Sequence, residues 1–291
     1  MKISEVLDRV ASYHPDLGPD YVGADGIKVG DPDKECTGIV SALVPTVDII
    51  RKTIEMGANL LYVHEPTSYL TPDEPGWKAD FPCEVYDEKM KLCADHGIVI
   101  YRDHDHMHAH RPDSIFTGVI KYMGWEDYVV TEGKGVPFGY IIEFPEARTV
   151  KEINDDFIKR IGMNGLRYIG RAEDKLKRIA IVGHIYPEAF IPSTEKDGFY
   201  TDYSTEIIRA MQDEHIDGII PGEIIEWNLL AYIRDGISFG KKMACFNLGH
   251  YNWEELGAKY AKEWLTDITE GKVDIHYVPT GDVWNFQLGG N

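Results

Sequence analysis

The sequence of 291 residues has little cysteine, a deficit of positive charge and no long apolar run. Its four cysteines are never spaced as Cys-X-X-Cys, which argues against a zinc knuckle or a redox pair and predicts reduced thiols in a cytoplasmic protein. Thirty basic residues stand against 49 acidic ones, and the net charge of −19 disfavours nucleic acid and anionic membranes as partners. No stretch reaches the roughly 20 apolar residues that span a bilayer. The negative net charge is compatible with a metal ion or another cationic ligand.

Several well-known enzyme motifs are missing as well. The sequence has no Walker loop, no GxGxxG fingerprint and no GxSxG elbow, which weighs against NTP kinases, dinucleotide enzymes and serine hydrolases. The length fits one large or two moderate domains, and a polar, glycine-bearing segment at 124–136 is a candidate boundary.

Helical and extended patterns alternate along the chain. Apolar residues at three- and four-residue spacing predict helices near 3–13, 46–57, 84–96, 149–161, 202–215, 224–235 and 252–267. Short apolar runs predict strands at Ile39–Val44, Leu60–Val63, Ile98–Tyr101, Tyr140–Phe144, Ile179–Val182, Gly218–Ile220 and Met243–Leu248. This alternation predicts an α/β fold with a substantially parallel, buried sheet.

Histidines and carboxylates follow five of the predicted strands directly. In open α/β sheets, ligands bind beyond the carboxyl ends of the strands. The chain has only 11 histidines, so this placement favours a shared site. The residues concerned are His64 and Glu65, the segment 102–110, His184, Glu223, and His250 with Glu254.

The segment 102–110, RDHDHMHAH, carries four histidines at alternate positions. In an extended chain they would share one face, whereas on a helix His104 and His108 would come together. A solvated loop with capping histidines is the structural alternative. The density of imidazoles beside carboxylates favours a metal site that would suit Zn, Mn, Fe or Ni.

The other candidates depend on local geometry. His64 and Glu65 are adjacent, so both reach one site only if the strand ends between them, as Pro66 suggests. Such a pair of ligands could hold two ions. On a helix, His250 and Glu254 would face the same way and could chelate one ion, although a surface pair near a helix start has the same spacing. His184 and Glu223 are either site residues or ordinary hydrogen-bonding residues at strand and helix ends.

Four motifs in this order resemble the Nif-three-like family, also called GTP cyclohydrolase I type 2-like. They are LLYVHEP with His64-Glu65-Pro66; Tyr101 followed by His104 and then by His108-Ala109; Gly222-Glu223; and Gly249-His250 with Glu254. Their order and spacing match over most of the chain, and the middle section matches least.

This resemblance implies a two-domain α/β protein with mixed, largely parallel sheets, in which residues 1–125 and 240–291 form the metal-site domain and 126–239 the other. It also implies a dinuclear metal site between the domains and a toroidal homo-hexamer. The ligands would be His64, Glu65, His108, His250 and Glu254, with His104 close by.

Two positions depart from the family pattern. Glu65 replaces a usual second histidine, and His108 replaces a usual aspartate that can bridge two ions. Because a neutral imidazole nitrogen cannot bridge as a carboxylate does, either Glu65 takes over part of the bridging or the site holds one ion. The segment VGHIYPEAF also departs, so His184 would be a site residue particular to this subgroup.

The functional prediction is a hydrolase that depends on one or two divalent ions and uses a metal-activated water on an unknown small-molecule substrate, with nucleotides and cyclic amides as candidates. Glu223, His104 or His184 would move protons. The alternative is a metal-binding scaffold or regulatory interaction protein without turnover, whose metal site would be closed by protein ligands.

Overall fold

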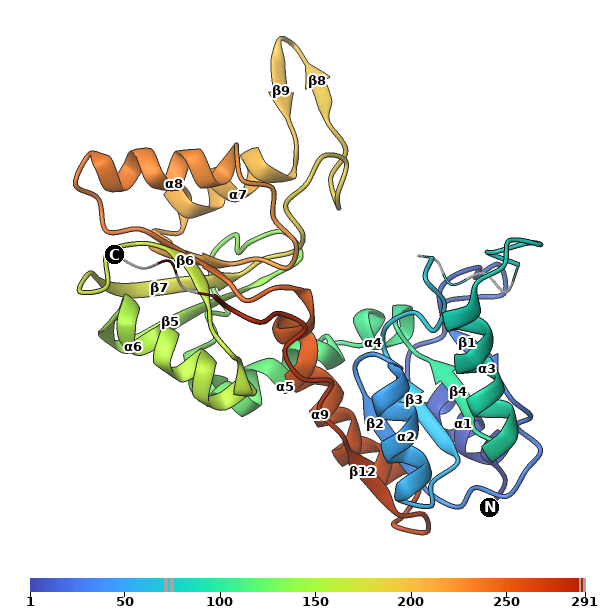
Figure 1. Ribbon diagram of the computed structural model, residues 1–291. Coiled ribbons are helices and arrows are strands. Elements are labelled where there is room, and N and C mark those ends of the chain that lie inside the picture. The colour runs from blue at the N-terminus through green and yellow to red at the C-terminus, as the bar shows by residue number, and fades with distance from the viewer. Residues whose placement is uncertain (71–72, 74–75, 288, 290–291) are drawn as a thin grey trace. The chain divides into compact units, whose positions relative to one another are not determined.

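The computed structural model describes residues 1–70, 73, 76–287 and 289, and it divides into two compact units (Figure 1). The first unit comprises Met1–Val119 and Glu254–Thr280, and the second comprises Ile120–Trp253 and Gly281–Asn291. Each unit has the mixed, largely parallel α/β architecture that the sequence predicts. The predicted domain boundaries, at 125/126 and 239/240, stay a prediction.

The first unit is built on a five-stranded sheet in the order β1-β4-β3-β2-β12. Its strands are β1 (Gly26–Val29), β2 (Ile39–Ala42), β3 (Leu60–Val63), β4 (Val99–Arg102) and β12 (Ile275–Tyr277). All neighbours pair in parallel except β1, which is antiparallel to β4 at the edge. β2 and β3 are buried at every position, which explains why they are continuous apolar runs.

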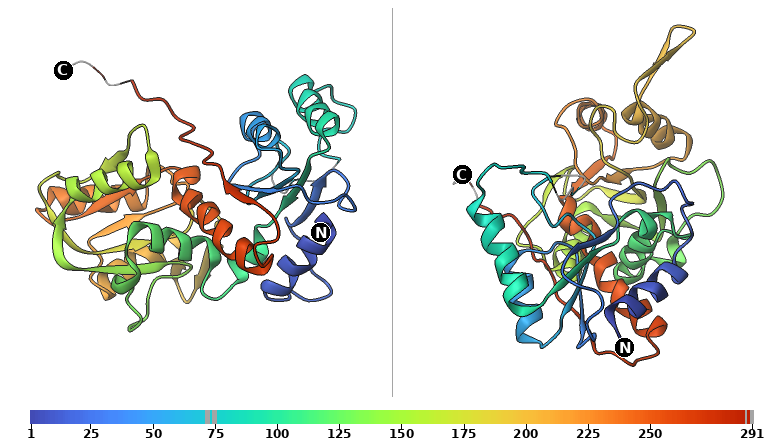
Figure 2. Two further views of the ribbon diagram at one scale, coloured as in Figure 1. Left: turned by 90° about the horizontal axis from the view of Figure 1, so that it is seen from below. Right: turned by 90° about the vertical axis from the view of Figure 1, so that its right-hand side faces the viewer.

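Helices cover both faces of this sheet (Figure 2). They are α1 (Ile3–Tyr13), α2 (Val47–Glu55), α3 (Glu84–His96), α4 (Asp105–Ala109), the part of α5 (Ser114–Met123) up to Val119 and the part of α9 (His250–Ile268) from Glu254 onward. α1 and α9 share an apolar cluster with Leu60 and Tyr62, whereas α2 and α3 share one with Leu61 and Val63. The alternation along β3 follows from the two-residue period of a strand.

The second unit contains a sheet in the order β5-β7-β10-β11-β6. Its strands are β5 (Tyr140–Thr149), β6 (Arg167–Ile169), β7 (Lys175–Ile181), β10 (Gly218–Ile220) and β11 (Ala244–Asn247). The three central strands are parallel, and β5 and β6 form antiparallel edges. The carboxyl ends of β7, β10 and β11 therefore lie at one edge of the sheet.

Helices also cover both faces of the second sheet (Figure 1). α7 (Tyr203–Asp213) and α8 (Leu229–Ser238) pack on one face through Ile207 and Ile233. α6 (Val150–Phe157) packs on the other, where Phe157 contacts Phe246 of β11. A hairpin of β8 (Thr194–Lys196) and β9 (Phe199–Thr201) extends away from the sheet. The short helices η1 (Glu126–Tyr128) and η2 (Ile158–Gly162) complete the unit.

Most predicted elements are found, with differences that have local causes. The helices at 3–13 and 84–96 match within their bounds. The helix predicted near 224–235 begins later, at Leu229, because Asn228 has a φ of +52° that a right-handed helix does not tolerate. The helix α5 is not predicted from the sequence. The edge strands β1, β6 and β12 and the β8–β9 hairpin are not predicted either, because short, partly exposed strands lack a continuous apolar run.

Among the described residues, no helix has the combination of length and apolar character that crossing a bilayer requires.

Candidate metal centre

The ends of β3 and β4 place two of the predicted motifs side by side. The two strands are parallel neighbours, with Val63 opposite Arg102. His64 and Glu65 follow β3 directly, and their N–H groups both donate to the carbonyl of Leu43, at 3.1 and 2.9 Å. Because the regular ladder stops at Val63, the strict alternation of a strand no longer applies, and both side chains can face one site. The strand thus ends at Val63, one residue earlier than the predicted end between His64 and Glu65.

The histidine-rich segment adopts the helical alternative. His104 is the N-cap residue of α4, and His108 lies one turn further on. The ring centroids of His64, His104 and His108 are 4.5 to 4.9 Å apart in all three pairs. The structure thus gathers three imidazoles from two strand ends, and we call these residues, with Glu65 and Glu254, the histidine cluster.

Glu254 of α9 lies between two of these imidazoles. Its Oε2 is 3.7 Å from Nε2 of His64, and its Oε1 is 3.7 Å from Nε2 of His108. The Glu254 side chain is 2% exposed and that of His64 is 1% exposed. A carboxylate at this depth needs compensation by a cation or by hydrogen bonds.

The other ring nitrogen of each histidine is held in place by an acceptor. Nδ1 of His64 lies 3.0 Å from the carbonyl oxygen of Asp103, Nδ1 of His104 lies 2.7 Å from Asp105, and Nδ1 of His108 lies 2.8 Å from Asp113. A carbonyl can only accept, so Nδ1 of His64 carries the proton and its Nε2 keeps a lone pair. This arrangement is typical of metal-binding histidines.

Nε2 of His64 is the atom in the cluster that is best prepared to bind a cation. It is buried and has no hydrogen-bond partner among the residues that the structure describes. Burial, together with the neighbouring His104 and His108, holds the pKa of His64 well below its usual value, so the imidazole is neutral and able to bind a metal. Three imidazoles and two carboxylates are a donor set that fits a divalent ion.

Two further charges set the electrostatics of the cluster. Burial lowers the pKa of His108, but the hydrogen bond to Asp113 and the charges of Asp113, Glu254 and Glu65 outweigh it and raise the pKa above its usual value. Arg102 is buried, donates from Nε to the carbonyl of His64 at 3.0 Å, and lies 3.7 Å from Glu65. Its positive charge offsets part of the buried acidity.

Asp25 positions α4 and is not predicted as a site residue from the sequence. Its carboxylate accepts the N–H groups of His104, Asp105 and His106, and the ring of His106 also contacts it. The carboxylate thus caps the amino end of α4 from a segment about 80 residues earlier in the chain. No local pattern in the sequence marks Asp25, Asp105 or Asp113 as supports for the three histidines.

A second cluster lies within the second unit. His184, Glu223 and His250 each stand three residues beyond the end of their strand, β7, β10 and β11 respectively. Glu223 is 2.7 Å from Nδ1 of His184 and 2.8 Å from Nδ1 of His250. Burial raises the pKa of Glu223, but the hydrogen bonds with His184 and His250 outweigh it and hold the pKa well below its usual range.

The predicted site residues therefore fall into two groups. His64, Glu65, His108 and Glu254 come together, and His104 joins them. His184, Glu223 and His250 form the second cluster. A role for His250 as a ligand of the same ions as Glu254 stays a prediction.

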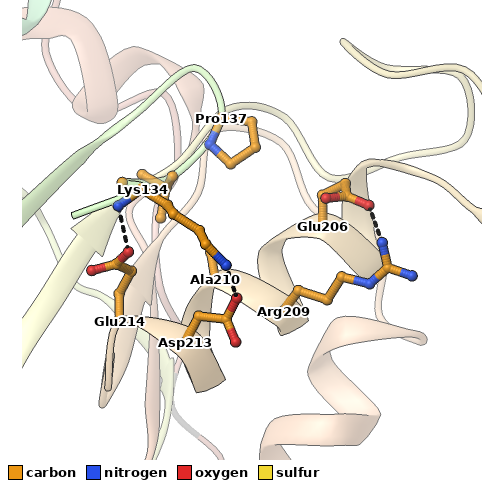
Figure 3. Close-up of a pocket in the computed structure, with 9 residues that line it drawn as sticks. Lys134, Pro137, Glu206, Arg209, Ala210, Asp213 and Glu214 are labelled. Carbon is orange, nitrogen blue, oxygen red and sulfur yellow. Dashed lines mark hydrogen bonds and ion pairs between the residues drawn. The ribbon is translucent and has the colours of Figure 1, made fainter.

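An open pocket beside α7 has fewer groups available to bind a ligand than the two clusters have. It is lined by Lys134, Pro137, Arg209 and neighbouring acids (Figure 3). Its charges are already paired: Lys134 with Asp213 at 3.0 Å, and Arg209 with Glu206 at 2.8 Å. Exposed pairs of this kind contribute little, and the buried acid of the pocket, Glu214, already accepts the N–H of Lys134 at 2.7 Å.

Comparison with known proteins identifies relatives over much of the chain. A protein of Clostridium perfringens (strain 13 / Type A) named GTP cyclohydrolase 1 type 2 homolog is 25% identical over 190 residues, which cover 62% of this chain and 69% of that protein. Among solved structures, Staphylococcus aureus SA1388 has a TM-score of 0.68 at 17% identity and covers 99% of both chains. A Bacillus cereus protein related to NIF3 has a TM-score of 0.65 at 14% identity, again over 99% of both chains.

These structural likenesses show a common fold. A family model, described as Duf34/NIF3 (NGG1p interacting factor 3), matches residues 1–184, a span that carries His64, Glu65, His104 and His108. The resemblance inferred from the four sequence motifs is confirmed, and the chain belongs to the Duf34/NIF3 family.

Proposed function

We propose that this protein is a divalent-metal-dependent hydrolase whose reaction takes place at the histidine cluster. The observation that carries the proposal is the buried Nε2 of His64, which lacks a hydrogen-bond partner among the described residues while its Nδ1 is fixed by Asp103. His64, Glu65, His108 and Glu254 would hold the ion or ions. A divalent ion in such a site lowers the pKa of a bound water and polarises an electrophile.

The residues of the histidine cluster differ in burial, and this difference suggests a different role for each. His64 and Glu254 are almost fully buried and would hold the ion from the protein side. His104 and His108 have side chains about a third exposed, 30% and 27%, so they border the side from which a substrate and water would enter. A cluster that is closed on one side and open on the other favours catalysis over a purely structural role.

His104 is the candidate for proton transfer within the cluster. Its Nδ1 is held by Asp105, and that hydrogen bond is the main reason why the pKa of Asp105 lies well below its usual range. Asp105 therefore stays ionised and orients the ring, so that Nε2 is the atom that would exchange a proton. Glu223 and His184, the other predicted proton carriers, belong to the second cluster.

The carboxylates support two ions rather than one, the alternative that the sequence also allows. Glu254 directs one oxygen toward His64 and the other toward His108, which is the arrangement of a carboxylate between two metal positions. With Glu65 as a further donor, we propose a dinuclear site in which Glu254 and Glu65 supply the bridging that His108 cannot. Zn, Mn, Fe and Ni all suit this mixed imidazole–carboxylate set.

For the substrate, we propose a small molecule with a hydrolysable ring or ester, such as a nucleotide or a cyclic amide. The name of the Clostridium relative, GTP cyclohydrolase 1 type 2 homolog, favours a purine nucleotide. The net charge of −19 disfavours a triphosphate unless the bound ions offset it. The resemblance also supports a toroidal homo-hexamer, which light scattering of the full chain would test.

The decisive experiment compares metal content and turnover in matched variants. We expect purified protein to hold a divalent ion, and His64→Gln and Glu254→Gln to lose it together with hydrolysis of a panel of nucleotides, phosphoesters and cyclic amides. His96→Gln, an exposed histidine at the end of α3, is the control and should keep both. Unchanged metal content in both cluster variants would show that the site is assigned wrongly. Metal bound without turnover of any compound would support the scaffold alternative.

A further inference from the structure

We propose that the second unit binds a small phosphate monoester in a pocket between β6 and α8. The pocket has a volume of about 230 Å³, and all the residues that line it belong to this unit. It shares no residue with the histidine cluster or with the second cluster. The proposal therefore does not depend on hydrolysis at the histidine cluster.

The strands β6 and β11 form one wall of the pocket. They are antiparallel neighbours, with Ile169 opposite Cys245 and Arg167 opposite Asn247. Residues two positions apart on a strand point to the same face of the sheet. All four side chains therefore lie on one face, and Ile169 and Cys245 pack there against the apolar residues of α8.

The helix α8 forms the opposite wall. Leu230 and Arg234 are four residues apart, so they are neighbours on the helix surface. Leu230 packs with Ile169 and Cys245 in one apolar cluster. Burial raises the pKa of Cys245 to about 12, so its thiol carries no negative charge near neutral pH. The inner part of the pocket is therefore apolar and uncharged.

Arg234 brings a positive charge to the pocket without a protein partner. Its side chain is exposed, and its guanidinium group forms no hydrogen bond or ion pair within the part of the chain that the structure describes. The chain has 49 acidic and 30 basic residues, so this is not due to a shortage of acids. The five N–H donors of the group are available to a ligand.

Two further polar residues of the pocket can also bind an anion. Nη1 of Arg167 lies 3.4 Å from Oε1 of Glu226, and the two side chains are 69% and 76% exposed. Such an exposed pair contributes little, so a more highly charged anion can replace Glu226. Oδ1 of Asn247 accepts the N–H of Gly249 at 3.2 Å, which leaves the Nδ2 donors of Asn247 for a ligand.

This combination of groups fits a phosphate that carries a short apolar substituent. Two guanidinium groups against the one carboxylate of Glu226 leave a positive charge at the pocket, although the whole chain has a net charge of −19. A local charge of this sign attracts anions. Guanidinium groups bind phosphate oxygens through paired hydrogen bonds, and a phosphate dianion has oxygens for two of them. The apolar wall would contact the substituent.

Calorimetric titration of the full-length protein with phenylphosphonate tests the proposal. This compound resembles a phosphate monoester, but its carbon–phosphorus bond is not hydrolysed. We expect it to bind, and inorganic phosphate to bind more weakly because it lacks the apolar group. Arg234→Gln and Arg167→Gln should each weaken the binding of phenylphosphonate by about tenfold or more, through the loss of charge-assisted hydrogen bonds.

Arg51→Gln is the matched control for the two arginine variants. Arg51 is also exposed and also lies 3.4 Å from an acid, Asp48, but it belongs to α2 of the first unit. This variant should bind phenylphosphonate as wild type does. Wild-type affinity in both pocket variants would place the anion elsewhere, metal ions included, and would overturn the proposal. The same conclusion would follow if wild type did not bind phenylphosphonate at millimolar concentration.

Glu226→Gln distinguishes anion binding from a structural role of the arginines. The substitution releases Arg167 and removes the negative charge from the pocket, so the affinity for phenylphosphonate should rise severalfold. Benzyl alcohol, which has the ring but no acidic group, should bind far more weakly than phenylphosphonate. A loss of affinity in Glu226→Gln would show that the pair with Arg167 builds the pocket instead. Equal affinity for the alcohol would indicate an apolar hollow that does not recognise anions. Either result would overturn the proposal.

Discussion

Asp113 illustrates how much of a metal site lies in residues that do not contact the metal. Its Oδ2 holds Nδ1 of His108, while its Oδ1 accepts the N–H groups of Ile115 and Phe116 at the start of α5. Asp113→Asn keeps an acceptor for the helix but removes the negative charge behind His108. We expect metal affinity to fall by roughly 10- to 100-fold, as for other partners of metal-binding histidines.

Competition with a chromophoric zinc chelator measures this loss of affinity. Asp95→Asn, an exposed aspartate paired with Lys91 on α3, is the control and should bind as wild type does. A wild-type dissociation constant in Asp113→Asn would mean that His108 needs no carboxylate behind it.

Lys89 is a buried cation whose charge costs stability at neutral pH. It lies on α3 and donates from Nζ to the carbonyl of Thr67 at 2.7 Å, and burial lowers its pKa to about 8. In the unfolded chain its pKa is near 10.5. Between these values the unfolded state binds more protons, so the contribution of Lys89 to stability rises with pH across this window and is lost as pH falls through 8.

Urea unfolding of wild type and Lys89→Met at pH 7.5 and 9.5 checks this. Wild type should gain more stability than the variant on going to pH 9.5, by up to about 2 kcal/mol, because this step covers about 1.5 units above the folded pKa and one unit is worth 1.36 kcal/mol. Equal changes in both proteins would show that Lys89 titrates normally.

At the scale of elements, α4 is a helix of five residues that depends on a distant carboxylate. Isolated helices of this length do not form in water, so the cap from Asp25 and packing must hold it. We expect Asp25→Ala to lower the free energy of unfolding by about 1–2 kcal/mol, at the upper end for a lost cap, and to weaken metal binding because His104 and His108 lose their common support.

Chemical denaturation and zinc titration of the same samples measure both effects of Asp25→Ala. Asp20→Ala, an exposed neighbour in the same segment, should change neither. A loss of stability without a loss of zinc affinity would show that Asp25 stabilises α4 but does not support metal binding.

α5 and α9 approach each other closely through two glycines. A Cβ at Gly257 would lie 2.7 Å from Cα of Ile115, and one at Gly118 would lie 2.6 Å from the carbonyl of Leu256. We expect Gly257→Ala to destabilise the protein by about 1–3 kcal/mol, because an added methyl group forces the two backbones apart. Thermal unfolding would show this, with Lys262→Ala on the exposed side of α9 as the control. An unchanged melting temperature would mean that the helices separate at no cost.

The helices α3 and α8 show how far local sequence patterns predict structure. The apolar spacing at 84–96 is followed by Gly97, whose φ of +64° ends α3 where the glycine signal places it. The segment from 224 onward is equally apolar, yet Ile224 pairs with Ile185 as a parallel bridge, and this contact between distant residues keeps the start of the segment extended. Edge strands such as β6 carry only three residues, too few for a pattern to emerge.

For the whole molecule, the position of a polar residue after a buried strand was the strongest guide to the site. It predicted His64, Glu65, His108 and Glu254, and the structure brings these four together. It also predicts His184, Glu223 and His250, which follow strands of the second sheet and come together there, and the sharing of one site by the two groups stays a prediction. Asp25 is not predicted either, because it can cap α4 only when β1 pairs with β4 in the folded protein.

Bound ions should stabilise the whole protein, because they bind the assembled clusters and not the dispersed ligands of the unfolded chain. A free zinc concentration 100 times the dissociation constant of one site would add about 2.7 kcal/mol to the free energy of unfolding. Thermal unfolding with and without a chelator measures the gain. Glu254→Gln should lose the part due to the histidine cluster, and His96→Gln should keep the full gain. A cation bound to the buried carboxylate of Glu254 must be released when the protein unfolds, and this raises the free energy of unfolding. Equal melting temperatures of the wild type with and without zinc would therefore contradict preferential binding to the folded state.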